Sequence, residues 1–194
     1  MAKYGFFNSL NGDRTYDADD LSDFFLKLIP NGILRSSGAD PLKVSEGTGM
    51  NVEIAPGYAF IQAKYLLIEA ATSLTIPAAD STLDRIDRVV IRLDRQQRKM
   101  YLRVSAGTPA ATPEPPDLAR LSSVYDLSLA TISVSAGATA ITDANITDDR
   151  SDSALCGLVS GFSALGGLEF LKCTQAEYDA MTAHDADTIY IIVG

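Results

Sequence analysis

The sequence is poor in the residues on which many catalytic and disulfide-rich proteins depend. It contains one histidine, His184, two cysteines and no tryptophan. Histidine-based acid–base or triad chemistry would therefore rest on His184 alone, and we expect it to be a surface residue. Cys156 and Cys173 do not make a disulfide framework or a CxxC zinc motif, so we expect both to be buried thiols.

Positive charge and long apolar runs are also scarce. The chain has 16 basic and 25 acidic side chains, a formal charge of -9 that would repel nucleic acid and anionic membrane surfaces. No apolar run approaches the roughly 20 residues of a membrane span, and the N-terminus lacks a signal-peptide pattern. We therefore expect cytoplasmic synthesis, with neither nucleic acid nor membrane as a partner.

The common signatures of enzymes and metal sites are missing as well. The sequence has no G-x-S-x-G, P-loop or H-E-x-x-H motif, so we predict no catalytic residue, no cofactor and no enzymatic activity. A glycoside hydrolase using two carboxylates stays open as an alternative. Asp143, Asp148, Asp149 and Asp152 lack the EF-hand calcium pattern, and capping or turn formation explains them more simply, so no metal is predicted.

What the sequence does contain is a pattern of short strands. From Pro41 to Gly107, apolar and polar residues alternate between Gly and Pro turns, which indicates antiparallel strands. Two strands meet near Gln62, and the clearest hairpin joins Val89–Leu93 to Met100–Val104. On its polar face, Arg88 and Arg92 alternate with acids, which predicts a charge ladder facing solvent or a neighbouring subunit.

Helical periodicity is confined to two short segments. Asp17 can cap a helix whose apolar residues, Leu21, Phe24, Phe25 and Leu28, fall on one face. This face can pack on its own domain or on a neighbouring subunit. The second helix starts with a capping box over residues 174–177.

Two segments rich in helix- and strand-breaking residues divide the chain. Four prolines lie in residues 108–116, which predicts an exposed extended loop, and residues 157–167 are rich in Gly, Ser and Ala, which predicts a flexible linker. Beyond this linker, strand-like residues 168–172, the second helix and the uncharged strand 188–193 predict a β-α-β unit. The last strand must be paired or covered, because an uncharged edge promotes aggregation.

The predicted fold class is mainly β with a few helices (α+β). We expect a small antiparallel β-sandwich or barrel-like domain with an N-terminal amphipathic helix and a C-terminal β-α-β appendage. The predicted boundaries are a domain at 1–156, the linker at 157–167 and a small module at 168–194.

Several stretches, in order, resemble a family of phage tail-tip and upper-baseplate proteins. They are FFNSLNGDR (6–14), YDADD (16–20), GMNV (49–52), PGYA (56–59), RIDRVV (85–90), AGTPA (106–110), ITDDR (146–150) and CG (156–157). At the other end, TQAEYD (174–179) with TIYII (188–192) resembles a short module that recurs near the ends of phage tail and fibre proteins. The resemblance identifies residues 1–156 as a tail or baseplate attachment domain.

The resemblance implies a non-enzymatic structural subunit of a phage tail tip or baseplate, made in the cytoplasm of the host bacterium and incorporated into the virion. It would act as connector or adaptor for the receptor-binding apparatus, with other tail proteins and copies of itself as partners and a trimer by analogy. A host-surface carbohydrate-binding tail or fibre protein is the alternative. The residues predicted to form a subunit interface are Phe6, Phe7, Phe24, Phe25, Arg88, Arg92, Tyr190, Ile191, Ile192 and Val193.

Overall fold

The computed structural model describes residues 7–13, 15–35, 40–159, 169–181, 184 and 188–193. The chain divides into two compact units, one spanning residues 31–161 and one grouping residues 1–30 with 162–194. The predicted domain boundaries stay a prediction, and residues 160–167 of the predicted linker and residue 168 of the predicted module lie outside the described residues.

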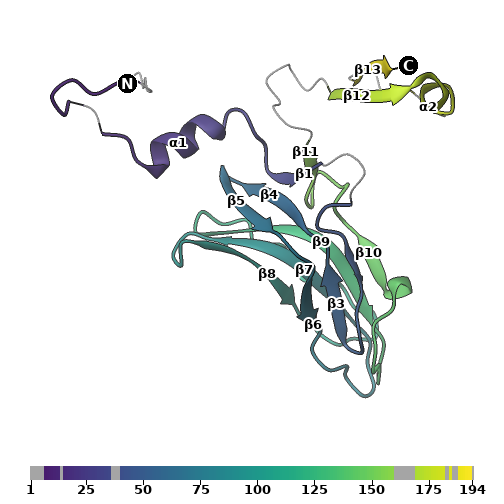
Figure 1. The fold of residues 1–194 in the computed structure, drawn as a ribbon. Coiled ribbons are helices and arrows are strands. Elements are labelled where there is room, and N and C mark those ends of the chain that lie inside the picture. The colour runs from purple at the N-terminus through teal and green to yellow at the C-terminus, as the bar shows by residue number, and fades with distance from the viewer. Residues whose placement is uncertain are drawn as a thin grey trace. The chain divides into compact units, whose positions relative to one another are not determined.

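Three sheets make up the unit spanning residues 31–161 (Figure 1). The first, in the order β11-β1-β4-β5, contains β1 (Gly32–Leu34), β4 (Gly57–Ile61), β5 (Lys64–Ile68) and β11 (Leu158–Val159). The second, in the order β2-β3-β6, contains β2 (Val44–Glu46), β3 (Asn51–Ile54) and β6 (Thr72–Thr75). The third, in the order β10-β9-β7-β8, contains β7 (Arg85–Asp94), β8 (Lys99–Ser105), β9 (Val124–Val134) and β10 (Ile146–Asp148), preceded by the short helix η1 (Asp143–Asn145).

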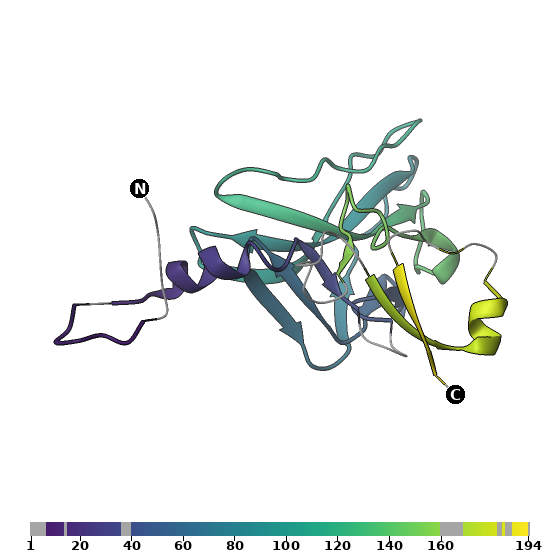
Figure 2. The same ribbon diagram turned by 90° about the horizontal axis from the view of Figure 1, so that it is seen from above.

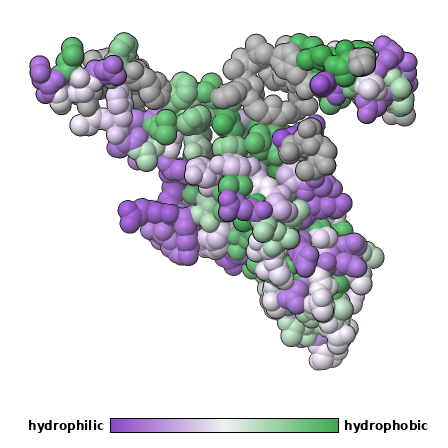
Figure 3. Space-filling view, in the orientation of Figure 1, coloured by the Kyte–Doolittle hydropathy of each residue, from purple (hydrophilic) through white to green (hydrophobic). Residues whose placement is uncertain are grey.

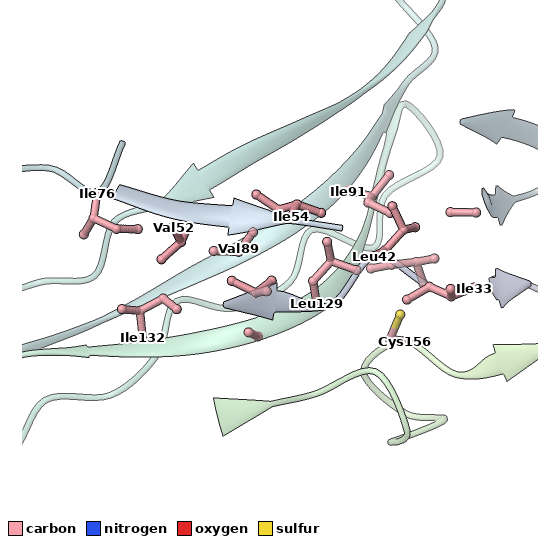
Figure 4. Packing of buried hydrophobic residues seen from close by; sticks show 14 of the residues in the cluster. Ile33, Leu42, Val52, Ile54, Ile76, Val89, Ile91, Leu129, Ile132 and Cys156 are labelled. Atoms are coloured by element: carbon pink, nitrogen blue, oxygen red, sulfur yellow. The ribbon is translucent and has the colours of Figure 1, made fainter. Parts of the chain in front are cut away.

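A single apolar core joins these three sheets (Figure 4). Ile33 from β1, Ile54 from β3, Ile91 from β7 and Ile132 from β9 are all fully buried in it. In the described residues of these three sheets, neighbouring strands are antiparallel except for the parallel pair β1 and β11. The mainly β prediction is confirmed, and the strands of the described residues form several sheets and no closed barrel.

The longest strand pair contains a register shift that sets which residues reach the core. Val89 pairs with Ala130 but Val90 pairs with Ser128, so Leu129 is the extra residue of a β-bulge. The bulge lets Leu127 and Leu129, at odd positions, face the same core as Ile132 and Val134, at even positions. Because of the bulge, β9 presents apolar residues to the core along its length, although the alternation of its sequence is interrupted at Leu129.

The proline-rich segment is an extended loop, as its composition predicts, but only part of it is exposed. Its four prolines are half-buried, and it belongs to the unit spanning residues 31–161. Gly107 N donates to Asp87 Oδ1 at 2.9 Å, and the Pro116 carbonyl accepts from Arg88 Nε at 3.0 Å. The Pro116 end of the segment therefore lies on the side of β7 to which Arg88 points, away from the core. Gly107, by contrast, binds Asp87, which alternates with Arg88 and shares the face of the core residue Val89.

The N-terminal helix forms as predicted but buries none of its residues. Helix α1 (Ala18–Phe25) starts at a capping box, in which Asp17 accepts from Asp19 N and Asp20 N while Asp20 accepts from Asp17 N. Turn hydrogen bonds continue to Ile29, whose N–H donates to the Phe25 carbonyl at 2.9 Å. No helix in the described part of the chain is both long and apolar enough to cross a bilayer.

The predicted turn between β4 and β5 is confirmed, and it places two non-glycine residues in the left-handed region. Gln62 has φ 50° and Ala63 has φ 60°, as in the two-residue turns that glycine favours. Gln62 is held there, because its N–H donates to Asn31 Oδ1 at 2.6 Å and its side chain accepts from Arg95. Ala63 has the same conformational cost, and no side chain of the described residues makes a hydrogen bond to it.

We therefore expect Ala63→Gly to raise the free energy of unfolding by about 0.5–1 kcal/mol, because glycine adopts a positive φ without the Cβ clash. Urea unfolding of both proteins measures the difference. Ala71→Gly is the matched control: Ala71 is an exposed loop residue without a positive φ, so glycine there should lower stability slightly. A loss of stability in Ala63→Gly would contradict the argument.

Candidate assembly surfaces

The C-terminal unit is a β-α-β module, as the sequence predicts. It comprises β12 (Glu169–Thr174), α2 (Gln175–Asp179) and β13 (Thr188–Val193), and the two strands run side by side in parallel (Figures 1 and 2). The predicted capping box is present: Glu177 N donates to Thr174 Oγ1 at 3.2 Å, and Thr174 N donates to Glu177 Oε2 at 2.8 Å. This reciprocal pair starts α2 directly at the end of β12.

Helix α2 covers one face of the two-stranded sheet. The Tyr178 ring packs edge-on against Tyr190 with 5.1 Å between centroids, and Cys173 is buried on the same face. His184 lies 4.1 Å from Tyr178 by ring centroids and is exposed. Three rings thus close one side of the module, and the single histidine of the chain takes part in that packing.

The opposite face of the module is open. Ile189 and Ile191 alternate with Tyr190 along β13, so they point away from α2, and they are 42% and 47% exposed. Ile192 on the covered face is also 41% exposed, while Val193 is half-buried. Hydrophobic surface gathers on this module in the space-filling view (Figure 3). Parallel sheets normally have both faces covered, so this face has the character of a contact surface.

The N-terminal residues predicted to form an interface are also accessible. Phe7 is 59% exposed and Phe24 is 45% exposed, whereas Phe25 is half-buried and packs edge-on against Phe24 at 5.6 Å. Phe6 lies outside the described residues. That these residues form a subunit interface stays a prediction.

Arg88 and Arg92 do not form the solvent-facing or subunit-facing ladder that the sequence predicts. Arg88 is 7% exposed and bonds through Nη1 to Ser128 Oγ at 2.9 Å and Asp149 Oδ2 at 3.1 Å. Arg92 makes two 2.7 Å bonds to Asp126, which also accepts from Ala119 N. The alternation is correct, but the proline-rich segment and residues around Asp149 cover this side of the sheet.

The carboxylates considered as calcium ligands are engaged separately in the described structure. Asp143 accepts from Glu46 N, Asp152 accepts from Ala154 N, Asp149 pairs with Arg88, and Asp148 pairs with Arg150. Among the described residues, no group of three or more His, Cys, Asp or Glu side chains is arranged to hold a metal ion. These acids cap turns and hold arginines.

The two cysteines are buried, as predicted. Burial raises the pKa of the Cys156 thiol to about 12, because a thiolate would lose its hydration there. A thiol with this pKa is protonated at neutral pH and is a poor nucleophile.

An aromatic surface that the sequence did not predict lies on the outer side of β4 and β5. Tyr58, Phe60, Tyr65 and Leu67 share the face opposite the core residues Ala59 and Ile61. Tyr58 stacks on Tyr65 and packs against Phe60, each with 5.4 Å between centroids, and Tyr65 is 63% exposed. The signal was the alternation of aromatic residues on both sides of the Gln62 turn.

Comparison with known proteins gives one match, at the C-terminal module. Residues 168–193 match the family model of the phage tail tip domain. No curated protein and no solved structure matches the chain. The match confirms the predicted resemblance of the C-terminal module to a module of phage tail proteins, and it suggests a phage tail structural protein located in the virion with other tail proteins as partners. The resemblance of residues 6–157 to tail-tip and upper-baseplate proteins stays a prediction.

The buried pair of Arg88 and Asp149 gives a stability prediction. Arg88→Ala leaves the buried Asp149 carboxylate without its cation, and we expect the free energy of unfolding to fall by about 3–5 kcal/mol. Lys43→Ala is the control, because its pair with Asp40 is more than half exposed and such pairs contribute at most about 1 kcal/mol. Chemical denaturation measures both losses, and equal losses would argue against the buried role.

Asp148 gives a prediction about acid stability. The Arg150 guanidinium lowers the pKa of Asp148 below its ordinary value. A carboxyl with a lowered folded-state pKa contributes stability that is present above its unfolded pKa, near pH 4, and is lost as the pH falls through the folded pKa. We expect stability to fall less steeply below pH 4 in Asp148→Asn than in the original chain.

Thermal unfolding between pH 2 and pH 7 measures this slope. The control is Asp117→Asn, since Asp117 is exposed and lies in no ion pair among the described residues. An identical acid slope in the original chain and Asp148→Asn would contradict the prediction.

Proposed function

We propose that this chain is a non-enzymatic structural subunit of a phage tail tip or baseplate, acting as a connector or adaptor for the receptor-binding apparatus. The main support for the proposal is that residues 168–193 combine a family match with an exposed apolar face. The stretch that matches the phage tail tip domain is also the β-α-β module with an open apolar face at Ile189 and Ile191.

The size of this module supports a role in assembly. Two parallel strands and a five-residue helix bury one sheet face only, and an isolated two-stranded sheet is marginal in water. Contact with another tail protein would cover Ile189 and Ile191 and stabilise the module at the same time. The module would then become fully stable on incorporation.

The use of ionisable groups in residues 31–161 supports a structural role rather than bond-making. Arg88, Arg92 and Arg150 each bind carboxylates of their own chain, and Arg88 and Arg150 also hold backbone carbonyls. These contacts fix loops against sheets. A domain held together in this way is what a structural connector requires.

The proposal is tested by placing Ile191→Asp in the gene of the phage that encodes this chain. A carboxylate in an apolar contact costs several kcal/mol unless it is paired, so we expect the subunit's copy number per particle to fall at least about tenfold. Quantitative mass spectrometry of purified particles measures the copy number. Leu121→Asp is the control, because Leu121 is 64% exposed and lies outside the module.

Three outcomes would overturn the proposal. The unaltered chain could be absent from particles, or Ile191→Asp could be incorporated as well as Leu121→Asp. Alternatively, the purified chain could hydrolyse cell-wall glycan and lose that activity when one acidic residue is replaced, which would favour the hydrolase alternative.

A further inference from the structure

The aromatic face of β4 and β5 is an apolar sheet surface that needs a cover. It is formed by Tyr58, Phe60, Tyr65 and Leu67, with Tyr65 63% and Leu67 44% exposed. The stacked rings already hold one another in place, so the surface is pre-formed and loses little side-chain entropy on binding.

The two ends of this face carry opposite charge. At the turn end, Arg95 binds the Gln62 side chain, and Arg98 and Lys99 follow in the β7–β8 hairpin. These three side chains are exposed, and no carboxylate lies within ion-pair distance of them among the described residues. The other end of β5 continues into exposed Glu69. A docking partner is therefore favoured when its acidic end lies beside the turn.

Helix α1 has the complementary properties. Leu21, Phe24, Phe25 and Leu28 form an apolar stripe, none of the helix is buried, and Leu21 is 49% exposed. The acids Asp17, Asp19, Asp20 and Asp23 lie at its N-terminal end and on its first turns, whereas Lys27 follows its C-terminal end. A helix packed on a sheet is a standard arrangement in proteins. Here the charges at the ends of α1 and of the aromatic face favour one direction of the helix along the sheet.

The direction in which the helix must lie on this face shows whether the helix comes from the same chain or from a second copy. Helical turns reach Ile29, and only Pro30 separates them from Asn31, whose side chain binds the Gln62 N–H at the turn. The C-terminal end of a chain's own helix is thus tethered at the basic end of its own face. Its acidic end would then have to point toward Glu69. A helix from a second copy has no such tether and can lie in the favourable direction.

We propose that α1 of one copy docks on the aromatic face of β4 and β5 of a second copy, with its acidic N-terminal end beside Arg95, Arg98 and Lys99. The contact holds copies of this chain together by exchange of N-terminal arms. The inference rests on the proposed assembly role, but its test needs only the purified full-length chain.

The first experiment measures self-association by light scattering over a range of protein concentrations. We expect species heavier than the 20.7 kDa chain, and at least about tenfold weaker association for both Leu21→Asp and Tyr65→Asp. Leu121→Asp should associate normally. Arg98→Glu should weaken association, and adding Asp23→Lys to it should restore it, since the charge pair is reversed.

The second experiment identifies the direction and the donor of the helix. One copy carries Leu21→Cys, the other carries Tyr65→Cys, and the two are mixed and oxidised; the native cysteines are 5% exposed or less. We expect a disulfide-linked dimer to form between Leu21→Cys and Tyr65→Cys. It should form faster than the dimer between Leu21→Cys and Leu67→Cys. A chain that carries both Leu21→Cys and Tyr65→Cys provides the opposing test. If its disulfide forms only within one chain, the helix docks on its own chain, and the proposed exchange of arms between copies is wrong.

Other outcomes also overturn the inference. A strictly monomeric chain would do so, as would glycan binding that is abolished by Tyr65→Asp while association is unchanged, because the face would then serve a carbohydrate. These failures are distinguishable from failure of the proposed function. Particle incorporation depends on Ile191→Asp, whereas arm exchange is measured without particles.

Discussion

The burial of Arg88 against Asp149 is the contact on which much of the larger unit depends. A guanidinium at 7% exposure must find acceptors for its donors, and it finds them in Ser128, Asp149 and the carbonyl of Pro116. One side chain of β7 thereby joins β9, the segment after β10 and the proline-rich segment. The polar side of the central sheet is as ordered as its apolar side, and for a different physical reason.

The sequence predicts local structure well where the pattern depends on neighbouring residues. The helix cap at Asp17, the capping box at Thr174, the turn at Gln62 and the β7–β8 hairpin all follow from residues within a few positions of one another. Local patterns do not show which segments, distant in the sequence, pack over a given face of a sheet. The alternation around Arg88 predicts a polar face but does not reveal that residues near Pro116, Ala119, Asp149 and Leu155 lie over it.

The bulge at Leu129 and the aromatic face show the same limit. Apolar positions 127 and 129 followed by 132 and 134 indicate an irregular strand, but only the pairing with β7 shows where the extra residue lies. Tyr58, Phe60 and Tyr65 are spread over two strands, and they become one surface only when the turn brings them together. The interface residues predicted at the two ends of the chain were chosen for an apolar character that is visible in the sequence alone, and their role in an interface stays a prediction.

The parallel pairing of β1 and β11 has a mechanical consequence. The chain enters the first sheet at the start of β1 and leaves it at the end of the adjacent, parallel β11, with Ile33 N bonded to the Gly157 carbonyl and Arg35 N bonded to the Val159 carbonyl. Tension between the two ends of the protein would pull these strands along their length in opposite directions. Both bonds would then be loaded together in shear and would not open one after the other, which suits a part that transmits force.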